Sequence, residues 1–325
     1  MPSFFEFLGV HGRACICAAL ASFTLAAAAC TPRAGFTRPP RPTAGTFDPA
    51  RVADIDVHAL PIIPEISAAT RANIRDTFAR GRAAGLDAGV FSKLGDCMTE
   101  NAHFLAPFGD GDFDLASHAS LAPIVTRFSK TPARSGKNWS QNSFSTPSLA
   151  AAGGFNVAAP LDPTWSNPEW CSNSESPLQC EFRVAHPSVV VLMFGTNDIA
   201  ATSPADFDYY LRTLVHDSLD AGVVPLLSTF PQRPEDPKKT LLLNRIVIAV
   251  AREYQAPVMN LFGALEALPG RGVDLNDTIH LSVPPDGRTD ILDDAHLRFG
   301  FTMRNLVTLQ ALNAVVAEFD PAMQQ

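Results

Sequence analysis

The stretch that decides the fold is residues 189–198, which have the sequence VVVLMFGTND. The first six residues are continuously apolar and β-branched at the start, a pattern typical of a strand buried on both faces in a parallel sheet. The run ends in a Gly-Thr-Asn-Asp turn. The sequence therefore predicts a central parallel strand that delivers Asn197 beyond its carboxyl end.

A second buried strand, residues 90–94, opens the stretch VFSKLGDCMT, residues 90–99. Its apolar run ends in Gly-Asp and is followed by Cys97, after which residues 98–101 could open a helix. A strand-to-helix corner of this kind exposes one side chain and offers backbone N–H groups to a developing anion. We therefore interpret Cys97 as the nucleophile of an acyl hydrolase. The alternative is an ordinary turn in which Cys97 is a buried small hydrophobe.

Helical and strand patterns alternate along the rest of the chain. Further strands are predicted over residues 223–230, with Pro225 as a flaw at an edge or bulge, and over residues 256–261. Helices are predicted over residues 67–84, 117–129, 148–152, 206–221, 239–254 and 294–319. Residues 155–180 show no clear period and are interpreted as a long surface excursion. The fold class is α/β: a three-layer α/β/α sandwich with a central, mostly parallel sheet and helices on both faces.

The N-terminal segment has the pattern of a secretory signal. Arg13 is followed by apolar and small residues up to position 29, a run that is short for a membrane span. The residues before Cys30 resemble a bacterial lipoprotein signal, although Ala27 replaces the usual Leu. We expect a signal peptide at residues 1–29, a Pro-rich tether at 30–50 and a hydrolase-like domain at 51–325. A lipid on Cys30 would anchor the exported protein to a membrane, with simple secretion as the alternative.

The cysteines of the mature chain are the next indication. Cys171 and Cys180 flank a polar loop, and we expect them to form a disulfide in an oxidising compartment. Cys97 is then left over. It is either functional, or buried and inert, or a replacement for one member of that pair.

Composition excludes several function classes. The net charge is −8 and no basic patch stands out, which argues against a nucleic-acid partner. The histidines have no spacing typical of a metal site, and no cofactor is expected. The absence of a Cys-x-x-Cys motif weakens a thiol-redox role.

Two Asp-x-x-His motifs near the C-terminus complete the candidate site: Asp277 with His280, and Asp293 with His296. The order of Gly-Asp-Cys, Gly-Thr-Asn-Asp and Asp-x-x-His resembles the SGNH hydrolase family, also called the GDSL esterases, over residues 88–310. The resemblance implies that Cys97 stands where the family usually has its Ser nucleophile. It also implies that Asn197 is the oxyanion donor and that one Asp-His pair supplies acid and base.

The family's backbone oxyanion donor is not matched. The family uses a Gly N–H from a block between the first two motifs, but residues 142–148 contain no Gly. Gly153 and Gly154 follow a little later in the chain.

The choice between the two pairs rests on their surroundings. His296 lies just before the last helix, where the family's His usually sits, but Asp293 could serve as a cap of that helix. His280 lies in an irregular loop with no helix to cap. We favour Asp277 and His280 and keep the other pair as the alternative.

The resemblance implies an exported acyl-ester hydrolase of the esterase or deacetylase type. Its substrate would be a small acyl ester, plausibly an acetyl group on a glycan. The thiol of Cys97 would be easier to ionise than a hydroxyl, helped by a helix N-terminus and a nearby His. The alternative, motivated by Cys97 and the missing Gly, is a catalytically inactive relative that serves as a binding module.

Overall fold

The computed structural model describes residues 38–45, 47–320 and 323. The predicted signal peptide, Cys30 and the first part of the tether lie outside the described residues. No helix of the described part is long and apolar enough to cross a membrane.

A four-stranded parallel sheet forms the centre of the fold. In the sheet, β1 (Asp87–Gly95), β4 (Pro187–Met193), β5 (Val224–Ser228) and β6 (Val258–Met259) lie side by side in that order. Every residue of β4 is buried, as its apolar run predicted. Gly95 pairs with Met193, so β1 and β4 end at the same level. The turns that follow these strands therefore leave one edge of the sheet together.

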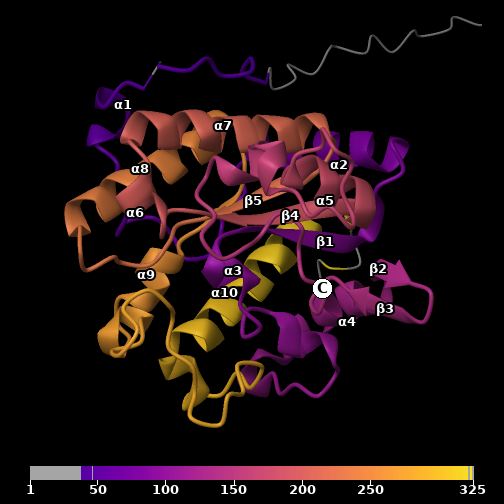
Figure 1. Cartoon of the computed structure of the whole chain (residues 1–325). Helices are drawn as coiled ribbons and strands as arrows, with labels where there is room; N and C mark the ends of the chain where they lie inside the picture. The colour runs from indigo at the N-terminus through magenta and orange to yellow at the C-terminus, as the bar shows by residue number, and fades with distance from the viewer. Residues whose placement is uncertain (1–37, 46, 321–322, 324–325) are drawn as a thin grey trace, which may run out of the picture. The chain divides into compact units, whose positions relative to one another are not determined.

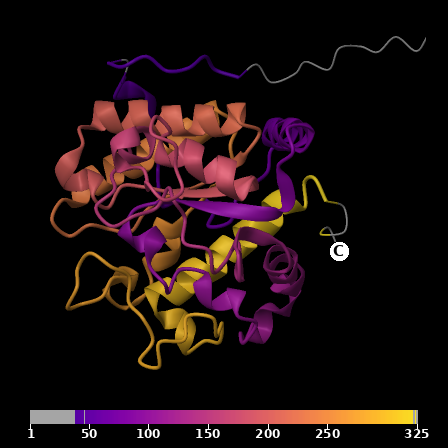
Figure 2. The ribbon, with the colours of Figure 1, turned by 45° about the vertical axis from the view of Figure 1, so that its right-hand side comes forward.

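Helices cover both faces of the sheet, which confirms the predicted three-layer arrangement (Figures 1 and 2). One face carries α5 (Pro177–Ala185), α7 (Pro204–Asp220) and α8 (Pro237–Glu253), and the other carries α4 (Ala122–Lys130) and α10 (Gly300–Val316). The strand pleat explains this: Phe91 packs on Phe128 of α4, while the Ser92 hydroxyl donates to Glu181 of α5 at 2.6 Å.

Helix α2 (Ala68–Ala83) begins as the sequence predicts, because the Ser67 hydroxyl accepts the N–H of Thr70. It lies where the strands begin and touches the ends of α8 and α10, through Asn73 to the Tyr254 carbonyl and through Phe78 stacked on Phe319. Short elements complete the fold: α1 (Ala50–Ala53), α3 (Cys97–Glu100), α6 (Asp198–Ala201), α9 (Leu261–Leu265), and a hairpin of β2 (Pro132–Gly136) and β3 (Trp139–Asn142).

The predicted last helix begins at Gly300 rather than at residue 294, and three other predicted elements were wrong in detail. Residues 117–129 are not one helix, because Pro123 cannot continue a preceding helix, so a 3₁₀ segment (Ala116–Leu121) gives way to α4. Residues 148–152 form a turn and a single bridge to β1 rather than a helix, since Gly95 N–H bonds the Ala150 carbonyl at the free side of β1. Pro225 lies in an interior strand, at a position before β5 begins to pair with β6.

The described part of the tether contacts the domain. Arg41 pairs with Asp217 at 2.8 Å, and Arg38 pairs with Asp220. These acids lie in the last turn of α7, where the helix dipole disfavours negative charge. The two arginines therefore offset that cost and fasten residues 38–41 to α7.

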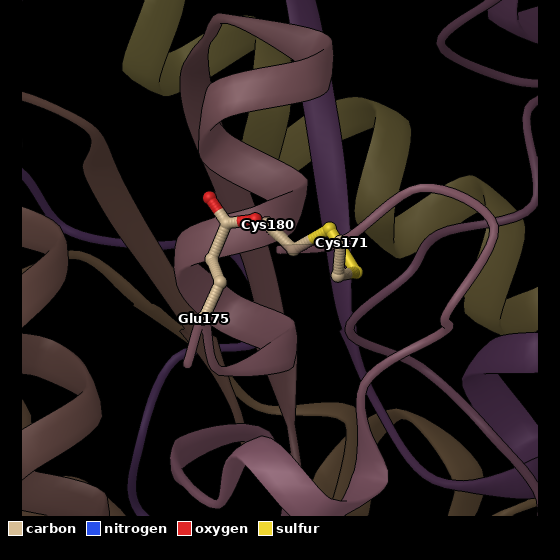
Figure 3. Close-up of side chains that lie close together, drawn as sticks. All are labelled: Cys171, Glu175 and Cys180. Carbon is tan, nitrogen blue, oxygen red and sulfur yellow. A yellow bond between two sulfur atoms is a disulfide. The ribbon is translucent and has the colours of Figure 1, made fainter. Parts of the chain in front are cut away.

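The excursion between β3 and β4 contains the predicted disulfide. Cys171 is bonded to Cys180 in α5 (Figure 3). The bond joins the excursion to a helix that packs on the sheet. Cys97 is the remaining free cysteine among the described residues.

Candidate active site

The Gly-Asp-Cys corner lies directly beyond the end of β1. Asp96 caps α3, because its Oδ1 accepts the Met98 N–H at 3.0 Å, and Cys97 is the first residue of that helix. Gly95 is required here, since a Cβ would lie 2.3 Å from Thr99 Oγ1 and 2.6 Å from the Met193 carbonyl oxygen. The local sequence thus fixes a tight corner that leaves Cys97 partly exposed.

The Gly-Thr-Asn-Asp turn follows β4, the neighbour of β1. Gly195 has φ +136°, and a Cβ there would lie 2.2 Å from the Phe230 ring. The Asn197 amide nitrogen donates to the Phe155 carbonyl at 2.8 Å. An amide nitrogen carries two hydrogens, so one remains for a ligand. Cys97 and Asn197 thus follow adjacent parallel strands at the edge where such sheets bind ligands.

Arg233 lies in the loop after β5, the next strand of the sheet. Its side chain is buried, donates to the Thr278 carbonyl at 3.1 Å and pairs with Glu235. Its positive charge acts on Cys97 and partly offsets the factors that raise the thiol pKa. Arg233 therefore contacts the loop that carries Asp277 and His280 and also acts electrostatically on Cys97.

Asp277 and His280 form a hydrogen-bonded pair. His280 Nδ1 lies 2.6 Å from Asp277 Oδ2, and Asp277 Oδ1 accepts the N–H of Ile279 at 3.0 Å. The hydrogen bond from His280, followed by that from Ile279, lowers the pKa of Asp277. Within the described part of the chain, His280 Nε2 has no hydrogen-bond partner. The pair thus has an orienting carboxylate on one ring nitrogen and an open second nitrogen.

Asp293 and His296 form a similar pair, but a third residue, Asp286, bonds the second ring nitrogen of His296. His296 Nδ1 lies 2.7 Å from Asp293 Oδ1, and its Nε2 lies 3.1 Å from Asp286 Oδ2. The hydrogen bonds to Asp293 and then Asp286 raise the pKa of His296. Both ring nitrogens are therefore engaged between two carboxylates.

The expected help from a helix N-terminus and a nearby His does not lower the pKa of the Cys97 thiol. Burial and then the neighbouring Asp96 carboxyl raise the pKa of the Cys97 thiol to about 11. Among the described residues, no hydrogen bond joins its sulfur to a histidine. The short helix α3 does not overcome these effects, so the thiol is neutral at rest.

A buried charge pair behind the corner was missed from the sequence. Burial raises the pKa of Asp96 to about 6, and burial lowers that of Arg304 to about 9. Arg304 on α10 donates to the Met98 carbonyl at 2.6 Å and to the Thr99 hydroxyl at 2.9 Å. Its guanidinium lies 3.6 Å from the centre of the Phe104 ring. The available signal was that Arg304 is the lone charged residue of α10.

The unmatched backbone donor remains unassigned. Gly153 does lie beside α3, but its N–H donates to Glu100 Oε2 at 2.5 Å. Gly154 follows with φ +82°. Gly153, which follows the region of the family's backbone donor, therefore lies near the corner, but its N–H is already bonded to Glu100.

A pocket of about 470 Å³ adjoins the Asp277–His280 loop. Thr278 lies in its wall with Gln232, Pro234, Val273 and Leu275. Its mostly apolar lining suits a small organic group.

Within the described residues, three potential metal ligands come together at one place. Cys171, Glu175 and Cys180 lie within 4.8 Å of one another (Figure 3). The two sulfurs are bonded to each other, and the Glu175 carboxylate pairs with Arg183 at 2.7 Å. These groups are therefore already engaged and are not free to bind a metal ion.

Comparisons with known proteins bear on this arrangement. The model of the GDSL-like lipase/acylhydrolase family matches residues 94–284. A solved acetyl esterase mutant with an acetate ion is similar at 13% identity and TM-score 0.41, covering 69% of this chain and 98% of that chain. A solved peptidoglycan O-acetylesterase is similar at 15% identity and TM-score 0.37, covering 55% and 49% of the two chains. The search of curated proteins gave no match.

Proposed function

Because the chain belongs to the GDSL-like lipase/acylhydrolase family, we propose that it hydrolyses acyl esters with Cys97 as the nucleophile. In this proposal His280 is the base, Asp277 orients His280, and Asn197 donates to the oxyanion. The acyl group is small, and the alcohol is part of a glycan.

One observation carries the proposal. Cys97, Asn197 and Arg233 follow three neighbouring parallel strands, and Arg233 holds the loop of Asp277 and His280 by its bond to Thr278. This order supports a proposal in which the groups for nucleophilic attack, oxyanion binding and proton transfer act at one edge of the sheet.

The proposed reaction has two halves. His280 Nε2 takes the thiol proton, the sulfur attacks the ester carbonyl, and Asn197 donates to the resulting oxyanion. Collapse forms a thioester and expels the alcohol, which takes the proton from His280. Water then attacks the thioester with His280 as base, releasing the carboxylic acid and restoring the thiol.

Two facts support His280 over His296. The Nε2 of His280 is open within the described structure, whereas that of His296 bonds Asp286. The segment matched by the family model also ends at residue 284, after His280 and before His296.

Export belongs to the same proposal. Its support is the apolar run up to position 29 followed by Cys30. A lipid on Cys30 would hold the enzyme at a membrane, with secretion as the alternative. Labelling with a radioactive fatty acid distinguishes them, because only the anchored form incorporates label that Cys30→Ala removes.

The test is turnover of p-nitrophenyl acetate. Cys97→Ala and His280→Ala are expected to lower kcat/KM by about a hundredfold or more. His296→Ala is the matched control and is expected to stay within about twofold. Activity that survives Cys97→Ala contradicts the nucleophile assignment.

A second candidate is a binding module without catalysis. The observation that favours it is the thiol pKa of about 11, far from that of an activated cysteine. It predicts an inactive parent protein and turnover that appears in Cys97→Ser.

A further inference from the structure

A second pocket lies beside the Asn197 turn. Its volume is about 500 Å³, and its wall includes Gly154, Asn156 and Ala158. The turn after β4 holds residues 154–158 in place. Asn197 donates to the Phe155 carbonyl at 2.8 Å, and Asp198 accepts the Val157 N–H at 3.1 Å. The pocket and the proposed oxyanion donor therefore share one rigid wall.

Two aromatic side chains line this pocket. Trp165 is 57% exposed, and its ring meets Phe155 edge to face with centres 5.8 Å apart. Tyr210 reaches the pocket from α7. A large, solvent-exposed aromatic surface within a pocket is typical of a binding site, because Trp and Tyr combine an apolar face with a polar tip.

The polar groups of the pocket define the charge of the ligand. Asp162 accepts the Thr164 N–H at 2.9 Å, and this hydrogen bond lowers the Asp162 pKa, so the carboxyl is ionised at neutral pH. Asn156 Oδ1 accepts from Ala158 N–H at 3.1 Å, which leaves its amide hydrogens for a ligand. The lining contains no Lys or Arg. An anionic ligand is therefore disfavoured, and one with many neutral hydroxyl groups is favoured.

We propose that this pocket is a saccharide subsite that binds a neutral hexopyranose unit. The apolar C–H face of the ring stacks on Trp165, and hydroxyl groups donate to Asp162 and accept from Asn156. An acyl chain would leave these polar groups unpaired, whereas a sugar satisfies both kinds of surface.

The subsite extends the proposed function. It rests on that function only for the identification of the bound sugar as the alcohol part of the substrate. If the chain is an esterase, the sugar bound at Trp165 is the alcohol part of the substrate, and its acyl group lies towards Asn197. Sugar binding itself requires no turnover and can be measured in Cys97→Ala.

The experiment is calorimetric titration of the full chain with tri-N-acetylchitotriose, cellotriose and trigalacturonic acid. We expect binding of at least one neutral trisaccharide and weaker binding of the acidic one. Trp165→Ala is expected to weaken the neutral binding by about tenfold or more. Trp165→Phe keeps an aromatic face and should bind the neutral trisaccharide more tightly than Trp165→Ala.

Trp139→Ala is the matched control. Trp139 is 45% exposed and lies in the β2–β3 hairpin, outside the pocket lining. Its removal should leave the dissociation constant within about twofold. The subsite is overturned if neither neutral trisaccharide binds the parent, or if Trp165→Ala binds as the parent does. Because Cys97→Ala serves equally in this titration, failure of the esterase proposal alone would leave sugar binding intact.

Discussion

The Arg304 guanidinium donates to the carbonyl oxygen of Met98 at 2.6 Å, directly behind the Cys97 corner. Arg304 is fully buried, and its positive charge interacts electrostatically with the Asp96 carboxyl. Removing one partner of a buried charge pair leaves the other uncompensated. We therefore expect Arg304→Met to lower the free energy of unfolding by roughly 3–5 kcal/mol in urea titrations.

Arg304→Lys is the conservative comparison. It keeps the charge but cannot bond the Met98 carbonyl and the Thr99 hydroxyl in the same planar arrangement. Arg304→Lys should lower the free energy of unfolding by less than Arg304→Met does. Equal stability of Arg304→Met and the parent would contradict a role for this pair in holding the corner.

Asp96 predicts a specific pH dependence of stability. Burial raises its folded pKa from 3.8 to about 6, so the folded protein holds this proton more tightly than the unfolded chain. Its contribution is therefore fully present below the unfolded pKa and is lost as pH rises through the folded pKa. Relative to Asp96→Asn, the parent should lose roughly 1–3 kcal/mol between about pH 4 and pH 7. Parallel stability curves for the two proteins would refute the assigned shift.

Cys97 predicts slow alkylation at neutral pH. With a thiol pKa of about 11, the reactive thiolate is scarce at rest. Iodoacetamide should modify the Cys97 peptide roughly a hundredfold more slowly than a free thiol at neutral pH. The rate, followed by mass spectrometry, should keep rising into the alkaline range. A plateau near neutral pH would show an activated thiolate instead.

The disulfide predicts a redox-dependent stability. Cys171 and Cys180 are 9 residues apart and close a small loop. Restricting the unfolded chain in this way is expected to contribute about 2–3 kcal/mol. Cys171→Ser should lower the unfolding free energy by that amount under oxidising conditions, whereas reductant should lower only the parent. A variant as stable as the oxidised parent would refute this contribution.

The central sheet could be predicted because its strands are strongly patterned. The continuous apolar run of β4 and the short run before Gly95 each permit one interpretation, and both lie where expected. The errors occurred where tertiary bonding decides the conformation. Residues 148–152 form a turn and a bridge because β1 offers them an unpaired edge, which no local propensity records.

The residues of the candidate site were proposed from motif order, but their electrostatics could not be predicted from the sequence. Motif order named Cys97, Asn197 and the Asp-His pairs. The thiol pKa depends instead on burial and on Asp96, and the engagement of His296 depends on Asp286, ten positions away in the chain. Arg233 and Arg304 act through distant loops and helices, so no residue spacing indicates their contacts.

The most direct test of the account is detection of the acyl-enzyme. The protein is exposed briefly to p-nitrophenyl acetate at neutral pH, quenched in acid, and digested for mass spectrometry. The account predicts one acetyl group on the Cys97 peptide in the parent and in His296→Ala, and none in His280→Ala. Ester hydrolysis with the acetyl group on another residue, or Cys97 acetylation that persists unchanged in His280→Ala, would contradict it.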